Sequence, residues 1–204
     1  MPDRRPYHHG NLREALIEAA VGLIGETGPQ GFSLAEAARR AGVSPAAPYR
    51  HFKGRDDLLE EIAKRGFEEF GAAMKAAWDE GRPNPLAAFA RLGQSYLDFA
   101  RQRPAFYVAM FESELSLADD PGLWEASERA FATLLQAAEA LSAPLPVDRR
   151  PPPRMFANHI WALSHGVVEL FGRNKRGTRS PISAEDMLNS GVLIYLRGLG
   201  LIGD

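Results

Sequence analysis

The spacing of apolar residues along the chain is helical almost throughout. Leucine, isoleucine, alanine and aromatic residues recur at three- and four-residue steps, and no alternating run bounded by turn residues indicates a β-strand. We therefore predict an all-α fold of about nine helices. The predicted helices span about 12–27, 34–41, 45–52, 55–78, 85–102, 104–117, 122–143, 153–173 and 184–202.

Capping residues mark the ends of the first two predicted helices. Asn11 is a good N-cap for the first helix, and Gly28-Pro29 ends it. Ser33, followed three residues later by Glu36, predicts a capping box at the start of the second helix. Gly42 then supplies a C-terminal stop, so the second helix is predicted to be short.

Two short helices joined by the tight turn Ala41-Gly42-Val43-Ser44 are typical of a helix-turn-helix unit. Ser44 is the predicted N-cap of the second helix of the pair, which carries Pro45 in its first turn. Pro48 lacks the N–H that would bond to the Ser44 carbonyl, so we expect a local 3₁₀ adjustment there. An ordinary corner of a helical bundle uses the same glycine stop and serine cap, and spacing alone leaves that alternative open.

A cluster of polar and basic side chains lies directly after this turn. Tyr49, Arg50, His51, Lys53 and Arg55 fall within seven residues. Arginine and lysine neutralise phosphate charge and release counterions, while a tyrosine hydroxyl or a histidine ring adds directed hydrogen bonds to phosphate oxygens. This chemistry favours DNA binding over a packing role for the segment.

The combined pattern resembles the TetR-type transcriptional regulators. The residues that carry the likeness are Gly31-Phe32-Ser33-Leu34, Ala41-Gly42-Val43-Ser44, Tyr49-Arg50-His51-Phe52-Lys53 and Leu58-Leu59. One branch of the family, whose body domain is named for its Trp-His-Gly (WHG) signature, is further resembled by Tyr7-His8-His9-Gly10-Asn11-Leu12-Arg13 and by Trp161, His165 and Gly166. The resemblance implies a helix-turn-helix DNA-binding domain at 1–55 and a helical ligand-binding and dimerisation domain at 56–204.

The resemblance also implies roles for single residues. The family's groove-facing positions fall on Pro45, Ala46 and Tyr49, and its phosphate contacts fall on Ser33, His51, Lys53 and Arg55. Ser44 and Arg50 complete the expected DNA-binding set. Pro45 and Ala46 can touch a thymine methyl group but cannot donate to a guanine edge. Hydrogen-bonded readout is therefore expected from Tyr49, Arg50 or an N-terminal arm at residues 4–5.

For the body, the resemblance implies a homodimer whose last two helices form a four-helix bundle, with two recognition helices about one DNA turn apart on a pseudo-palindromic operator. Gly166, Gly191 and Gly198 permit close helix approach, or they relieve crowding inside one subunit. The aromatic body suits a cavity for an apolar or aromatic small molecule, which we expect to release a repressor from its operator. Candidate ligand-binding residues are Tyr96, Tyr107, Met110, Phe111, His159, Trp161 and His165.

Composition and charge narrow the function further. The net charge of −2 excludes a uniformly basic protein, yet residues 1–55 hold eight lysines and arginines against five acids, so this part carries +3 and the remainder −5. The absence of cysteine excludes disulfides, thiolate catalysis and cysteine-ligated zinc. No cofactor or metal is expected. No signal-peptide pattern and no apolar run of membrane-spanning length occur, so we expect a cytoplasmic protein without a membrane partner.

Two other classes of function stay open. His165 and Glu169 lie four apart on one predicted helix face and could share a metal or a proton in a small helical enzyme, although two ligands are too few for a convincing site. A helical adaptor without DNA binding could instead hold an acidic partner through the basic loop at 173–179. Substitution of Lys53 and Arg55 separates these classes, because only a regulator would lose salt-sensitive DNA binding.

Overall fold

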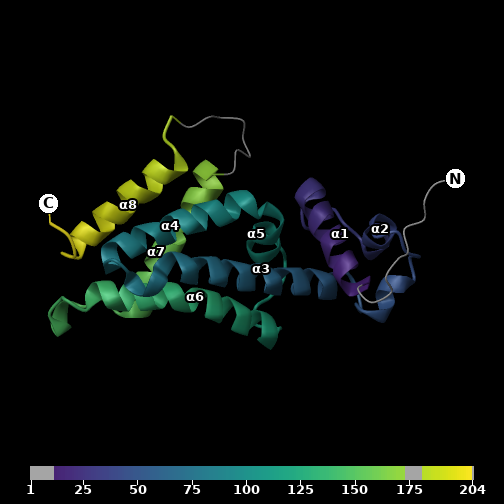
Figure 1. Ribbon diagram of the computed structural model, residues 1–204, viewed down its shortest axis with the longest axis horizontal. Helices are drawn as coiled ribbons and strands as arrows, with labels where there is room; N and C mark the ends of the chain where they lie inside the picture. Colours follow the sequence, from purple (N-terminus) through teal and green to yellow (C-terminus); the bar gives the residue numbers. More distant parts are fainter. Residues whose placement is uncertain (1–11, 173–180, 204) are drawn as a thin grey trace. The chain divides into compact units, whose positions relative to one another are not determined.

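The computed structural model describes residues 12–172 and 181–203, and in these ranges the protein is all-helical (Figure 1). The all-α prediction is confirmed. The eight α-helices are α1 Leu12–Thr27, α2 Leu34–Arg40, α3 Arg55–Trp78, α4 Pro85–Gln102, α5 Pro104–Phe111, α6 Pro121–Ser142, α7 Pro153–Val167 and α8 Ala184–Gly198. Shorter segments are the 3₁₀ turns η1 Ala47–Arg50, η2 Asp79–Gly81 and η3 Val147–Arg149, and the π-helical turn η4 Val168–Gly172.

The chain forms two compact units. The first comprises the chain up to Gly66 together with Pro104–Trp124, and so contains α1, α2, η1, the first half of α3, and α5. The second comprises Phe67–Arg103 and the chain from Glu125 onward, which includes the second half of α3, α4, most of α6, α7 and α8. No helix in the described ranges is both long and apolar enough to cross a bilayer.

The predicted capping box is present at the start of α2. The Ser33 Oγ accepts the Glu36 N–H at 3.2 Å, and a Glu36 carboxylate oxygen accepts the Ser33 N–H at 3.0 Å. The first helix ends where predicted, because Gly28 follows it with a φ of +79°, a conformation that glycine adopts at no steric cost. Local sequence signals therefore determine both ends of the α1–α2 connection.

The predicted third helix is shorter and tighter than expected. It begins at Ala47 rather than after Ser44, and it is a 3₁₀ turn without a side-chain cap. The Ser44 carbonyl accepts the Ala47 N–H at 3.0 Å, and the Pro48 carbonyl accepts the N–H groups of His51 at 2.8 Å and Phe52 at 2.9 Å. The 3₁₀ adjustment expected at Pro48 is thus confirmed, and it explains why the described residues contain eight α-helices rather than nine.

Helix α5 ends at Phe111 rather than near residue 117. The loop that follows leads to Asp120, whose Oδ1 accepts the N–H groups of Gly122 at 2.8 Å and Leu123 at 3.1 Å. A second oxygen of Asp120 lies 2.7 Å from Lys64 Nζ. This cap and ion pair require an irregular segment, although the leucines at 115 and 117 continue the helical spacing.

The last two helices are also shorter than predicted. Helix α7 changes to the π-helical turn η4 at Val168 instead of continuing to residue 173. Helix α8 ends at Gly198 rather than near 202, because Gly200 adopts a φ of +71° and the Leu201 N–H returns to the Leu196 carbonyl at 3.0 Å.

In the second unit, aromatic rings and small residues bring the helices together. Phe70 on α3 meets Tyr96 and Phe99 of α4 edge-on, with ring centroids 5.3 and 5.1 Å apart. Helix α3 approaches α6 closely at Gly71, where an added Cβ would lie 3.1 Å from the Ala130 Cα. The helices α4, α7 and α8 contact one another and complete the unit.

Candidate DNA interface and ligand cavity

The 3₁₀ turn η1 has one exposed and one buried side. Tyr49 is 65% exposed, and Arg50 and His51 are exposed as well. Pro48 and Phe52 are buried and anchor the turn in the first unit. The segment therefore presents a hydroxyl, a guanidinium and an imidazole on a short, anchored surface.

Three exposed basic side chains of the first unit have no hydrogen-bond or ion-pair partner among the described residues: Arg39, Arg50 and Lys53. The backbone N–H of Lys53 donates to Asp57 at 2.8 Å, which fixes the main chain before α3 and leaves the ammonium group in solvent. Arg39, in the last turn of α2, was not among the residues expected from the sequence. The signal available in the sequence was its place in the last turn of the short predicted helix, directly before the turn at 41–44.

Ser44, Pro45 and Ala46 are also exposed, in the turn between α2 and η1. Ser33 is exposed, but its hydroxyl is engaged within the capping box, where Oγ lies 2.9 Å from Glu36 Oε2. The N-terminal arm, Asn11 and the basic loop at 173–179 that was considered for an adaptor lie outside the described residues.

Arg55 is placed differently from the other basic residues. Its guanidinium donates to the Pro29 carbonyl and to Gln30 Oε1, the latter at 3.2 Å, and pairs with Asp56 at 2.8 Å. It also lies 5.1 Å from the centroid of the Phe32 ring. These contacts hold the connection between α1 and α2 against the start of α3.

A network of four charged side chains joins α1 to α3. Arg13 pairs with Glu61 at 2.8 Å, and Arg65 pairs with Glu14 and, at 3.0 Å, with Glu61. Hydrogen bonding from Arg13 lowers the pKa of Glu61, and hydrogen bonding from Arg65 lowers the pKa of Glu14. Arg13 also lies 5.4 Å from the Phe52 ring, so the network reaches the anchor of η1.

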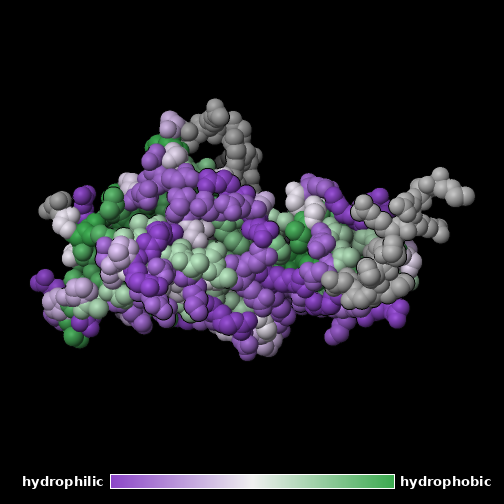
Figure 2. Space-filling view, viewed as in Figure 1, coloured by the Kyte–Doolittle hydropathy of each residue, from purple (hydrophilic) through white to green (hydrophobic). Residues whose placement is uncertain are grey.

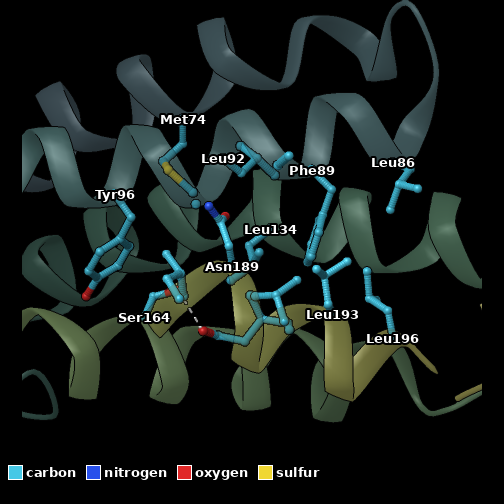
Figure 3. Close-up of a pocket in the computed structure, with 15 residues that line it drawn as sticks. Met74, Leu86, Phe89, Leu92, Tyr96, Leu134, Ser164, Asn189, Leu193 and Leu196 are labelled. Carbon is cyan, nitrogen blue, oxygen red and sulfur yellow. Dashed lines mark hydrogen bonds between the residues drawn. The ribbon is translucent and has the colours of Figure 1, made fainter. Parts of the chain in front are cut away.

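The second unit contains a cavity of about 330 Å³ (Figure 3). Its walls come from α3, α4, α6, α7 and α8, and they are mainly aliphatic. The lining residues are Met74, Leu86, Phe89, Ala90, Leu92, Gly93, Tyr96, Leu134, Ile160, Ser164, Leu188, Asn189, Val192, Leu193 and Leu196. An apolar cavity with few polar groups is the usual form of a small-molecule site.

Of the residues expected to bind a ligand, Tyr96 lines this cavity. His165 does not line it but contacts the Tyr96 side chain. The Tyr96 hydroxyl lies 3.1 Å from His165 Nδ1. His159 is exposed and lies 3.0 Å from the Tyr195 hydroxyl, and Trp161 is 38% exposed. Neither residue lines the cavity.

The remaining three candidates, Tyr107, Met110 and Phe111, belong to α5 in the first unit. The Tyr107 and Phe111 rings pack edge-on with centroids 5.0 Å apart. The sequence did not predict that Asn189 and Ser164 line the cavity. The candidates were chosen mainly among aromatic residues, whereas the lining is mainly aliphatic. The four-residue spacing of Leu188, Val192 and Leu196 was the signal for the inner face of α8.

His165 and Glu169, the pair considered for an enzyme, are not joined by a third metal-binding side chain among the described residues. His165 contacts Tyr96, and Glu169 lies in the π-helical turn η4. In residues 12–172 and 181–203 no group of three or more histidines and carboxylates could hold a metal ion.

Helices α7 and α8 carry apolar side chains on their exposed faces. Met155 is 53% exposed and Ile194 67%, and Figure 2 shows hydrophobic side chains gathered over the region of α8. A Cβ on Gly166 or Gly198 would meet nothing within 4 Å, whereas one on Gly191 would lie 3.1 Å from Leu163. Gly191 therefore relieves crowding inside the subunit, and the other two leave space at the surface.

Two family models match the chain. The model described as "Bacterial regulatory proteins, tetR family" matches residues 16–62, and the model described as "Tetracyclin repressor-like, C-terminal domain" matches residues 89–192. The first match covers most of α1, then α2, η1 and the start of α3. The second spans just over half of the chain and includes most of the residues that line the cavity.

Similar proteins are transcriptional regulators. The HTH-type transcriptional regulator BetI of Brucella anthropi is 33% identical over 108 residues, which are 50% of this chain and 56% of the relative. The uncharacterized HTH-type transcriptional regulator YobS of Bacillus subtilis is 28% identical over 100 residues, 49% of this chain and 51% of the relative. The chain thus spans about half the length of the curated relatives it matches.

Several solved structures share this fold over nearly the whole chain. A protein of unknown function from Rhodococcus sp. RHA1 superimposes with a TM-score of 0.79 at 28% identity, covering 96% of this chain and 98% of that one. The TetR family regulator PfmR of Thermus thermophilus shares the fold, with a TM-score of 0.68 at 21% identity and coverage of 89% and 97%. From the two domain matches, the chain belongs to the TetR family of DNA-binding transcriptional regulators, which are not enzymes.

Proposed function

We propose that the protein is a repressor that binds a pseudo-palindromic DNA operator as a homodimer and that an apolar or aromatic small molecule releases it. Residues 1–55 form the DNA-binding domain in this proposal, and residues 56–204 bind the ligand and form the dimer. The observation that carries it is the exposed face of η1, where Tyr49 and Arg50 stand in solvent on a turn anchored by Pro48 and Phe52.

The proposed DNA contacts divide by chemistry. Ser44, Pro45 and Ala46 contribute small groove-facing groups, and Tyr49 and Arg50 supply the hydrogen bonds that read bases. His51 and Lys53 contact phosphates. Ser33 and Arg55 belong to the same set, but Glu36 and the Pro29 carbonyl already engage them, so we assign them a smaller share of phosphate binding.

The proposed dimer forms through α7 and α8. The open space at Gly166 and Gly198 and the exposed Ile194 support this surface. Trp161, His165 and Gly166 further support membership of the branch with the Trp-His-Gly (WHG) body domain. Two symmetric subunits would place their reading segments about one DNA turn apart, which is why we propose a pseudo-palindromic operator.

Release by a ligand requires that the ligand bind one conformation better than another. The cavity suits this role because its wall includes Met74 of α3, the helix that begins at Arg55 soon after η1. Five further lining residues belong to α8, one of the proposed dimer helices: Leu188, Asn189, Val192, Leu193 and Leu196. A ligand in the cavity thus contacts both helices whose positions would set the spacing of the two DNA-binding domains.

The test begins with selection of bound fragments from random duplex DNA, which yields the half-site sequence and spacing. On the selected operator, Lys53→Ala should weaken binding evenly across sequences and reduce the slope of log affinity against log salt by about 1 per subunit. Arg50→Ala should cost about 1–3 kcal/mol and relax base preference. Arg129→Ala, an exposed arginine on α6, is the control. Failure to select any duplex, or unchanged binding by both variants, refutes the proposed interface.

A further inference from the structure

The cavity of the second unit has a wall without charged side chains. Fifteen residues line it, and none of them is aspartate, glutamate, lysine, arginine or histidine. The polar ones are Tyr96, Ser164 and Asn189. A charged ligand group placed against this wall would lose hydration without gaining an ionic partner, which strongly disfavours it.

Two of the three polar side chains are already engaged by the protein. The Tyr96 hydroxyl lies 3.1 Å from His165 Nδ1, and Figure 3 shows it pointing away from the other labelled side chains. The Ser164 hydroxyl donates to the Ile160 carbonyl at 2.9 Å, so it can only accept from a ligand. Both residues therefore contribute mainly surface to the cavity.

Asn189 is the third. It is exposed, so it lies where the cavity meets solvent, and its carboxamide has no hydrogen-bond partner among the described residues. Figure 3 draws this amide beside the Met74 side chain, at the edge of the apolar lining. An amide offers two donors and an acceptor, so it can bind an alcohol, a carbonyl or another amide. Leu86, Leu193 and Leu196 form an aliphatic part of the lining that Figure 3 places far from Tyr96.

The cavity volume limits the size of the ligand. Its 330 Å³ is a little more than twice the volume of an apolar cavity of about 150 Å³ that takes benzene, so about 12 non-hydrogen atoms fit. Leu86 and Leu193 are 41% and 44% exposed, and with the exposed Asn189 they mark the side on which the cavity opens.

We propose that the effector is a neutral, mostly aliphatic molecule of about 12 non-hydrogen atoms with one hydrogen-bonding head group, and that Asn189 binds this head group. The inference rests on the proposed function in taking this cavity as the effector site. It adds that the site rejects carboxylates and ammonium ions of the same length, and that the selecting residue lies on α8.

The experiment is a calorimetric titration of the full chain with decanamide and with decanoate near neutral pH. The two probes match in their number of non-hydrogen atoms and differ in charge. Decanamide should bind, and decanoate should bind about tenfold more weakly, because its charge is partly desolvated at the exposed Asn189 without an ionic partner. Asn189→Leu should weaken decanamide binding about tenfold by removing one hydrogen-bonding group. Gln136→Leu removes an exposed amide on α6 outside the lining, and it should bind decanamide like the wild type.

A second variant tests the same residue with little change of shape. Asn189→Asp should reverse the preference, so that the decylammonium ion binds more tightly than decanamide. No binding of decanamide, equal affinity for decanamide and decanoate, or unchanged decanamide binding by Asn189→Leu would overturn the inference.

Operator affinity is measured in the same samples, so that the two proposals fail separately. Asn189-dependent binding of decanamide that leaves DNA affinity unchanged supports the ligand class and refutes release by that ligand. Release of the operator by decanoate but not by decanamide supports ligand release and overturns the ligand class.

Discussion

The hydroxyl of Tyr96 on α4 and the Nδ1 atom of His165 on α7 lie 3.1 Å apart, and Tyr96 is only 3% exposed. This contact ties two helices together at the wall of the cavity. It also orients the Tyr96 ring as a lining surface, with the hydroxyl directed toward α7. A buried tyrosine hydroxyl that keeps a partner contributes to stability, whereas one that loses its partner is destabilising.

A double-mutant cycle should measure this contact. Tyr96→Phe and His165→Ala should show a coupling free energy of about 1 kcal/mol in urea unfolding. The comparison is the pair His159 and Tyr195, whose Nδ1 and hydroxyl oxygen lie 3.0 Å apart. His159 is exposed, so the coupling should be smaller. Equal coupling in both pairs would contradict the importance of burial at Tyr96.

The charged network between α1 and α3 should make stability depend on pH in the acidic range. The pKa values of Glu14 and Glu61 are lowered in the folded state from an ordinary value of 4.5. A lowered carboxyl pKa stabilises the fold above the unfolded-state pKa, and this contribution is lost as the pH falls through the folded-state pKa. The free energy of unfolding should therefore decrease below about pH 4.5.

Arg65→Met isolates that contribution. The variant should lose about 1 kcal/mol at neutral pH, since the carboxylates are partly exposed, and clearly less at pH values where Glu14 and Glu61 are protonated. Urea unfolding at both pH values gives the comparison. Arg129→Met is the control, because its 3.5 Å pair with Glu125 is largely exposed. An equal loss at neutral and acidic pH would show that Arg65 acts by packing alone.

Gly31 should not tolerate a side chain. A Cβ at this position would lie 2.5 Å from the Thr27 carbonyl oxygen, a backbone atom that cannot move without disturbing the end of α1. Gly31→Ala should cost about 1–3 kcal/mol in thermal or urea unfolding. Gly54→Ala, where a Cβ meets nothing within 4 Å, should change stability by less than about 0.5 kcal/mol. Similar losses in the two variants would contradict the steric explanation.

The proposed dimer surface can be tested by adding one charge. Ile194→Asp places a carboxylate on an apolar side chain that is 67% exposed, and it should shift the protein toward monomer in sedimentation velocity. Val147→Asp alters a residue that is 79% exposed on η3, outside α7 and α8, and should leave the association state unchanged. A dimer that persists in Ile194→Asp at the wild-type dissociation constant would exclude this surface.

Much of the fold could be predicted because its signals are local. The capping box at Ser33 and the 3₁₀ turn at Pro48 depend on residues within four positions of each other. The predicted ends of α5 and α7 were wrong. The segment after α5 depends on a distant contact, because Asp120 pairs with Lys64, which lies more than fifty residues earlier. The end of α7 was missed because apolar spacing alone does not distinguish an α-helix from the π-helical turn η4.

The candidate sites show the same division. Tyr49, Arg50 and Lys53 are exposed, as the family motif implies. This could be predicted because the three residues lie within five positions of one another in one short segment. The engagement of Arg55 depends on the Pro29 carbonyl, which only the folded chain brings near. The cavity depends on the meeting of five helices, which apolar spacing does not predict. Aromatic content therefore pointed to Tyr107 on α5, whereas the lining is mainly aliphatic and includes Asn189.

Leu163 on α7 packs against Gly191 on α8 within the same chain, so these two helices contact each other without a second chain. A pair of helices with its own internal contact need not wait for association in order to fold. Dilution of the proposed dimer should accordingly yield folded monomers instead of denatured chains, so that its dissociation constant can be measured separately from conformational stability.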